Sequence, residues 1–182
     1  PGTDIINDGA LLTHDDRIIA VGSAEEVLAH PSATNASVLD RIDCKNQLLL
    51  PGFIDCHTHL VYAGDRSHEF EQRLEGVSYE EIARQGGGIR STVTDTRQST
   101  QKDLVKRALG RVKRMCSQGV TTIEVKGGSG LTLGCEQKIL REVRSLETVL
   151  HVSVPTTFLG AHAEPEQFDG SSREYIGLRG CV

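Results

Sequence analysis

The sequence PGFIDCHTHL at residues 51–60 divides the chain into two parts of different character. Residues 53–61 predict an apolar strand with polar residues at alternate positions. Because side chains two residues apart point to the same face of a strand, His57 and His59 present two imidazoles side by side, with Asp55 on that face. Two neutral imidazoles on one face are a natural half of a zinc or iron site. The alternative interpretation is a partly exposed histidine pair at a strand end.

Strands and helices alternate along the chain after this point. Hydrophobic spacing predicts a strand at 53–61, helices at 80–85 and 100–117, a strand at 120–126, a helix at 133–146 and a strand at 152–160. This order predicts an α/β fold with a parallel sheet and right-handed crossovers. It fits an open doubly wound sheet or part of a (β/α)8 barrel, and a whole barrel takes about 250 residues. No G-x-G-x-x-G fingerprint follows a strand, which disfavours nucleotide binding.

The part of the chain before residue 51 is predicted to be a small β unit. Ser23 and Glu26 have the spacing of a capping box, which marks the start of a helix. Pro31 is expected to end that helix and to begin a loop. The elements expected in this part are strands at 10–13, 17–22, 38–42 and 47–50 and a helix at 24–30.

Composition excludes several classes of protein. Lys and Arg number 20 against 25 Asp and Glu, a formal net charge of −5, whereas a nucleic-acid-binding protein usually has a basic excess. No run approaches the roughly 18 consecutive apolar residues of a membrane span. The five cysteines form no Cys-x-x-Cys pair and no secreted disulfide pattern, so we expect a reducing, cytoplasmic compartment and buried free thiols that pack as small apolar groups. The chain begins with Pro1, and we interpret it as a piece of a longer protein.

Polar residues also follow the later strands. Thr122, Glu124 and Lys126 are expected on one face of the strand at 120–126, which would suit the wall of a site; the alternative is a simple ion pair. His162 follows the strand at 152–160 and could bind a substrate or exchange protons near neutral pH. Its alternative is a surface histidine in a loop.

Two sets of basic residues invite different interpretations. Arg66 lies in the loop after the histidine pair and could bind a carboxylate through two parallel hydrogen bonds, or it could be an exposed loop arginine. The basic residues of the 100–117 helix are predicted to form a solvated face opposite its apolar stripe. These residues are Lys106, Arg107, Arg111, Lys113 and Arg114.

Several stretches together resemble a known family. Residues 51–66, PGFIDCHTHLVYAGDR, are similar to the first barrel strand of the metal-dependent amidohydrolase superfamily and, in their continuation, to the imidazolonepropionase family. Further stretches agree with that family in order. They are DGA (8–10), RIIAVG (17–22), YEEIA (79–83), GGGI (86–89), GVTTIEVK (119–126) and TFLGAH (157–162).

The resemblance implies a fold, a reaction and a set of site residues. Residues 1–51 would be a small β-sandwich portion, and residues 52–182 the N-terminal part, about three strands, of a truncated (β/α)8 barrel. The family hydrolyses 4-imidazolone-5-propanoate to N-formimidoyl-L-glutamate with a metal-activated water, which makes a small molecule the expected partner. His57 and His59 would be ligands to one zinc or iron ion, and the general base would lie beyond residue 182. A homodimer is expected for the full-length protein.

The resemblance also assigns the substrate-binding residues. Arg66 and His162 match positions that hold the imidazolone-propanoate. The family loop Lys-Ser-Gly-Tyr-Gly-Leu reads KGGSGL here at residues 126–131, so Ser129 replaces a substrate-binding tyrosine. This replacement leaves open another cyclic amidase or an aminohydrolase of the superfamily. A third interpretation is an inactive fragment or isoform that acts as a binding module.

Overall fold

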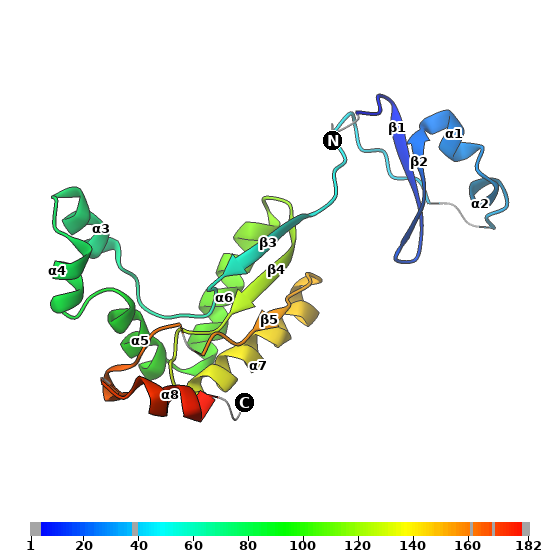
Figure 1. Ribbon diagram of the computed structural model, residues 1–182. Helices are drawn as coiled ribbons and strands as arrows, with labels where there is room; N and C mark the ends of the chain where they lie inside the picture. Colours follow the sequence, from blue (N-terminus) through cyan, green and yellow to red (C-terminus); the bar gives the residue numbers. More distant parts are fainter. Residues whose placement is uncertain (1–4, 38–39, 161, 169, 180–182) are drawn as a thin grey trace. The chain divides into compact units, whose positions relative to one another are not determined.

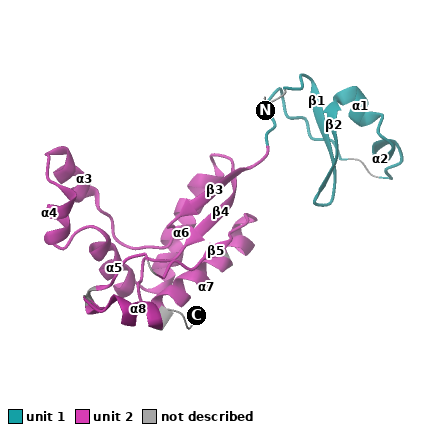
Figure 2. Cartoon of the chain, in the orientation of Figure 1, with its two compact units in different colours: residues 1–50 teal, residues 51–182 magenta. Residues whose placement is uncertain are grey.

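The computed structural model describes residues 5–37, 40–160, 162–168 and 170–179. The chain forms two compact units, residues 1–50 and residues 51–182 (Figure 2). Unit 1 contains a small antiparallel sheet and unit 2 a three-stranded parallel sheet with helices. The mixed α/β class is therefore confirmed, whereas the barrel and the β-sandwich remain predictions.

Unit 1 is a β-hairpin followed by two short helices. β1 (Gly9–His14) pairs antiparallel with β2 (Arg17–Ser23), as the sequence predicts. The capping box is also present: the Ser23 hydroxyl accepts from the Glu26 N–H, and the Glu26 carboxylate accepts from the Ser23 N–H at 2.9 Å. It starts α1 (Ala24–Leu28). Of the residues described in unit 1, only Val27 and Ala33 are buried.

Three expectations for unit 1 are wrong. Pro31 does not begin a loop but starts a second helix, α2 (Pro31–Thr34), because proline suits the first helical position. The described residues 40–42 and 47–50 form no strands, and residues 38–39 lie outside the described part of the chain. A strand needs a neighbour for its backbone groups, and the described residues supply none to these segments.

The sheet of unit 2 has the order β3-β4-β5, with all strands parallel (Figure 1). β3 (Phe53–Thr58) and β5 (Thr156–Thr157) flank β4 (Val120–Lys126), whose bounds match the prediction. β3 ends earlier than expected because Leu60 and Val61 leave the sheet and join the hydrophobic core. β5 is shortened to two residues, with a separate bridge between Thr122 and Ser153. Pro155 lies between Ser153 of this bridge and the start of β5, and it has no N–H to donate to the hydrogen-bond ladder.

Helices connect and cover these strands. Three were expected: α4 (Tyr79–Arg84), α6 (Gln101–Cys116) and α7 (Leu133–Leu150), which is four residues longer than predicted. The hydroxyls of Ser78, Thr100 and Thr132 cap their first turns. The sequence analysis missed α3 (Ser67–Leu74), α5 (Ile89–Gln98), the 3-10 turn η1 (Glu166–Phe168) and α8 (Ser172–Arg179).

The core of unit 2 lies between β4 and the two long helices. Ile123 and Val125 of β4 are fully buried. They pack with the predicted stripe of α6 and with one side of α7, which contribute Leu104, Ala108, Val112, Ile139, Val143 and Leu146. This packing fixes the face of β4 that turns away from the helices, and thereby the direction of its polar side chains.

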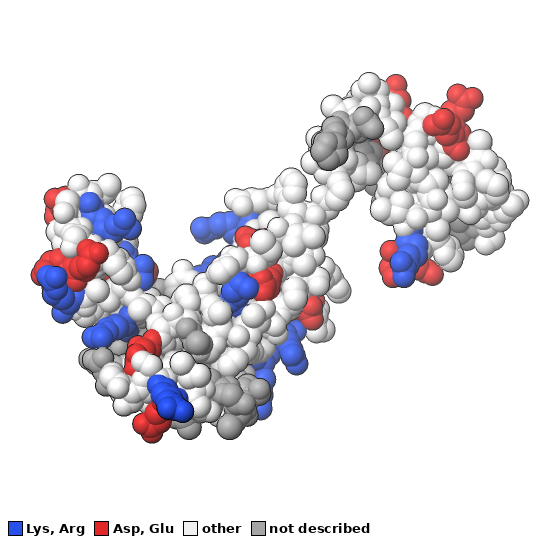
Figure 3. All heavy atoms as spheres, in the orientation of Figure 1, with Lys and Arg blue, Asp and Glu red and all other residues white. Residues whose placement is uncertain are grey.

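No helix among the described residues is long and apolar enough to cross a membrane. Acidic and basic side chains are interspersed on the face drawn in Figure 3. The described cysteines, at 44, 56, 116 and 135, are free thiols. Cys116 and Cys135 are partly buried, whereas Cys44 and Cys56 are exposed, so the expectation of buried thiols is wrong for these two.

Candidate functional site

Three histidines lie together at the ends of the parallel strands. The ring centroids of His57 and His59 are 5.5 Å apart, at an interplanar angle of 62°. The ring of His162, which follows β5, lies 4.9 Å from that of His59. Because parallel strands end at the same edge of a sheet, residues more than 100 positions apart meet here. The strand topology thus brings three of the five predicted site residues into one cluster.

His59 is the central member of this cluster, and its surroundings favour the neutral ring. Burial lowers the pKa of His59, and the neighbouring His162 and His57 lower it further. A hydrogen bond with the Gly127 backbone and the charge of Glu136 oppose this shift in pKa. A neutral imidazole is the form that binds a metal ion, and a second hydrogen bond to backbone commonly orients such a ligand.

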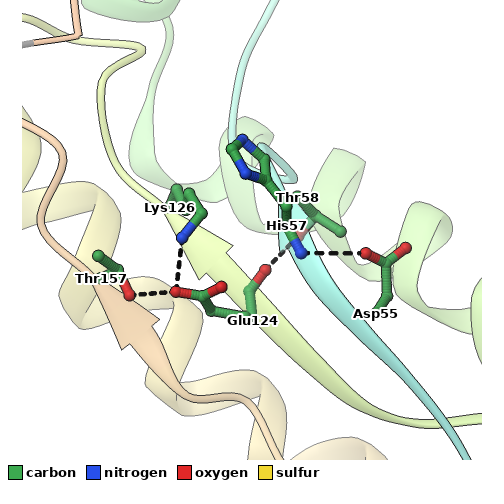
Figure 4. A network of polar contacts seen from close by, with 6 residues as sticks. All are labelled: Asp55, His57, Thr58, Glu124, Lys126 and Thr157. Atoms are coloured by element: carbon green, nitrogen blue, oxygen red, sulfur yellow. Dashed lines mark hydrogen bonds and ion pairs between the residues drawn. The ribbon is translucent and has the colours of Figure 1, made fainter.

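A polar network covers the neighbouring face of β4 (Figure 4). Lys126 Nζ lies 2.7 Å from Glu124 Oε1, and the Thr157 hydroxyl of β5 donates to the same oxygen. The Thr58 hydroxyl of β3 donates to the backbone carbonyl of Glu124 at 2.7 Å. The hydrogen bond from Lys126, followed by that from Thr157, lowers the pKa of Glu124. All three strands therefore meet at Glu124. The alternation predicted for β4 is confirmed, and Glu124 and Lys126 form the ion pair that was the alternative interpretation. A role of this face as the wall of a site stays a prediction.

The loop after β4 is held by a carboxylate that the sequence analysis did not single out. Glu136 of α7 is completely buried, and its two oxygens accept hydrogen bonds from Gly128, Gly130 and Leu131. Ser129 lies inside this loop and is only 4% exposed. An acidic residue in the first turn of a helix that follows a glycine-rich loop is the signal that could have identified Glu136.

Arg66 lies at the start of α3 in a pair with a buried acid. Its Nε is 3.3 Å from Glu69 Oε2, and its side chain is 43% exposed. Glu69 also accepts a hydrogen bond of 2.9 Å from the Gly88 N–H. Among the described contacts, Arg66 is joined to this acid and not to the histidine cluster. Sequence reasoning missed Glu69, although its position three residues after Arg66 on a helix predicts a pair.

Arg111 corrects the prediction of a solvated basic face on α6. Its guanidinium donates to the backbone carbonyls of Leu60 and Tyr62 at 2.7 and 3.0 Å. It also lies over the Tyr62 ring, 3.6 Å from the centroid. Burial lowers the pKa of Arg111. Arg111 therefore fixes the segment that directly follows the histidine pair, while Lys106 and Arg114 are exposed as predicted.

The donor set fits part of a metal site. His57 and His59 offer two imidazoles with ring centroids 5.5 Å apart, and imidazole nitrogen is a common zinc ligand. No group of three or more side chains that could hold a metal ion occurs among the described residues. Since catalytic zinc usually has three protein ligands, the described residues provide an incomplete set.

Comparison with known proteins decides what the chain resembles. It is 48% identical to an imidazolonepropionase of Bradyrhizobium sp. over 176 aligned residues. The alignment covers 97% of this chain and 42% of the relative. The chain is 47% identical to the imidazolonepropionase of Caulobacter sp. over 176 residues, with the same coverage. The resemblance to imidazolonepropionases is confirmed.

The alignments with imidazolonepropionases cover nearly all of this chain but less than half of each relative. A third relative, the imidazolonepropionase of Psychromonas ingrahamii, is 47% identical over 92% of this chain and 42% of its own length. The chain thus spans about two-fifths of the length of the relatives it matches. No family model matches it.

Proposed function

We propose that this chain forms part of a metal-dependent hydrolase that opens the ring of 4-imidazolone-5-propanoate to give N-formimidoyl-L-glutamate. The main support for this proposal is the cluster of His57, His59 and His162 at one edge of a parallel sheet. The chain that carries this cluster is 48% identical to an imidazolonepropionase over the aligned residues. In parallel α/β folds, this edge is where active sites are built.

In this proposal His57 and His59 hold one zinc or iron ion, and further ligands come from outside the described residues. The bound ion would supply an acidified water and polarise the ring carbonyl. Hydrolysis adds that water across the carbonyl carbon–nitrogen bond: the bond breaks, the oxygen stays in the new carboxylate, and the nitrogen takes a proton. The burial of His59 supports this role because it keeps the ring neutral and able to bind metal.

The remaining candidate residues would orient the substrate. The Arg66 ion pair with Glu69 runs through Nε, and we assign the Nη groups to the carboxylate of the propanoate, which a guanidinium matches in geometry. His162, which is exposed and lies beside His59, would donate or accept a hydrogen bond with the imidazolone ring of the substrate. Ser129 would contribute through the loop at 127–131, in which it is almost buried.

A second candidate is hydrolysis of a different cyclic amide by the same kind of site. Ser129 favours it, because a serine hydroxyl cannot replace the ring face and the reach of the tyrosine expected at this position. Under this alternative the metal ligands are unchanged, and only the preferred substrate differs.

The proposal is tested with the protein expressed at its natural full length. We expect loss of imidazolone-propanoate absorbance, release of N-formimidoyl-L-glutamate, and loss of both bound metal and activity in His57→Ala and His59→Ala. His14→Ala, which removes an exposed histidine at the end of β1, is the matched control and should retain both metal and activity. A folded protein that binds metal and opens other cyclic amides but not this one would support the second candidate. Full metal content in both variants would refute the assigned ligands.

A further inference from the structure

The loop at 127–131 has the form of an anion-binding site. It reads Gly-Gly-Ser-Gly-Leu and joins the end of β4 to the start of α7. Glycine-rich loops before a helix offer backbone N–H groups and the positive end of the helix dipole to an anion. A substrate with a carboxylate would be a natural occupant of such a loop.

Here the chain itself supplies the anion. The N–H groups of Gly128, Gly130 and Leu131 donate to the Glu136 carboxylate at 2.7, 2.7 and 2.9 Å. Glu136 is fully buried, and a buried carboxylate is tolerated only when hydrogen bonds replace its lost water. These three donors are consequently not available to a substrate.

The packing around Glu136 leaves the loop little freedom. A Cβ atom at Gly127 would overlap the Glu136 carboxylate, and one at Gly130 would overlap Cys135. Gly128 has a φ of +101°, in the left-handed region where a side chain is strained. The glycines of this loop therefore leave the space that the enclosed Glu136 carboxylate needs.

The same loop touches two histidines of the candidate site. The Gly127 backbone is hydrogen-bonded to His59. A Cβ atom on Gly128 would lie 2.9 Å from the Cβ of His162, so the backbone of the loop supports that residue directly. A change in the loop conformation would move the surfaces against which both rings rest.

We propose that Glu136 is a positioning residue, an internal anion that fills the glycine loop and so holds His59 and His162 side by side. A consequence is that the loop amides do not bind the carboxylate of the substrate. The effect on substrate binding rests on the proposed function, whereas the effect on the loop and the histidines does not.

The experiment removes the carboxylate and then returns it in solution. In the full-length protein, Glu136→Ala should lose the nuclear Overhauser contact between the His59 and His162 rings and lower the thermal midpoint. Added formate, which has the carboxylate of the deleted side chain, should recover part of both, and chloride at equal ionic strength should not. We expect KM for imidazolone-propanoate to rise by on the order of 10²-fold, with a smaller fall in kcat, since misplacement of about 1 Å has such effects.

Two variants make the result decisive. Glu142→Ala removes a charge elsewhere on α7 and should leave the ring contact, KM and the formate response unchanged. If Glu136→Ala does not fold, Glu136→Gln decides in the same assays, because its amide NH2 cannot accept a hydrogen bond from a backbone N–H. An unchanged ring contact and an unchanged KM in the folded Glu136 variant would overturn the proposal. A third outcome separates this proposal from the proposed function. If the wild-type protein shows the ring contact and Glu136→Ala shows the formate response, but the wild-type protein does not hydrolyse imidazolone-propanoate, the proposed function is overturned and the role of Glu136 is retained.

Discussion

β3 and β4 are neighbours in one sheet, yet they differ in nearly every physical respect. β4 is the central strand, and its Ile123 and Val125 are fully buried beneath α6 and α7. β3 has one strand neighbour in the described chain, and its Phe53 and Ile54 are 54% and 69% exposed. The histidine pair nevertheless lies at the end of β3, with His57 in the strand and His59 directly after it. The contrast indicates that β4 and its helices provide stability, whereas β3 provides chemical groups at an edge that β4 positions.

The largest expected difference is between isoleucines of these two strands. Ile123→Ala should lower the free energy of unfolding by about 2–5 kcal/mol, because it leaves a cavity in a closed core. Ile54→Ala should change it by no more than about 0.5 kcal/mol, since its side chain is largely in water. Chemical denaturation of both variants measures the difference. Equal losses would show that β3 is covered in solution.

The next effect concerns the contact that ties the end of β3 to α6. Arg111→Ala should cost about 1.5–3 kcal/mol, the range for hydrogen bonds from a charged group, because two carbonyls lose their donor. Arg111→Lys should recover only part of this, since an ammonium lacks the planar fork and stacks poorly on Tyr62. Arg114→Ala, at an exposed position of the same helix, is the control. A neutral Arg111→Ala would show that the segment after β3 needs no such anchor.

A smaller effect is expected in unit 1, away from both strands. Ser23→Ala should cost about 1 kcal/mol, the usual value for a lost helix N-cap. Thermal unfolding followed by a probe in unit 1 measures it. Because the units are separately compact, a probe on β4 should report no change, and a change there would mean that the two units unfold together.

The smallest effect is chemical and leaves the fold unchanged. Cys56 on β3 is exposed, whereas burial, reinforced by Glu136, raises the pKa of the Cys135 thiol. A raised pKa means less thiolate at a given pH, so Cys135 should be alkylated more slowly than Cys56 near pH 8. The difference should narrow as the pH rises toward the pKa of Cys135. Mass spectrometry of iodoacetamide-treated protein gives both rates, and equal rates at pH 8 would contradict the burial of Cys135.

Elements with a long, regular pattern could be predicted from sequence, and those without one could not. β4 and α6 have clear alternation and a clear apolar stripe, and their bounds agree with the prediction to within about a residue. α5, with its threonines and charges, has no such stripe. The five candidate site residues were named from their motifs, and three of them form a cluster.

The supporting contacts of the site were not predictable in the same way. Arg111 bonds to carbonyls about 50 positions away in sequence, and no local pattern reveals a partner at that distance. A run of five basic residues on one helix therefore looked uniform, although one of them is structural. Glu136 was overlooked for the related reason that a lone acid near a helix start has many ordinary roles.

The thin interior of unit 1 has a consequence for the lifetime of the protein. With only Val27 and Ala33 buried among its described residues, its helices and hairpin have little apolar burial to oppose local opening, and local opening is what exposes backbone to proteases. Digestion under native conditions should therefore cut first between residues 24 and 50, and should leave the α6–β4–α7 layer as the resistant product.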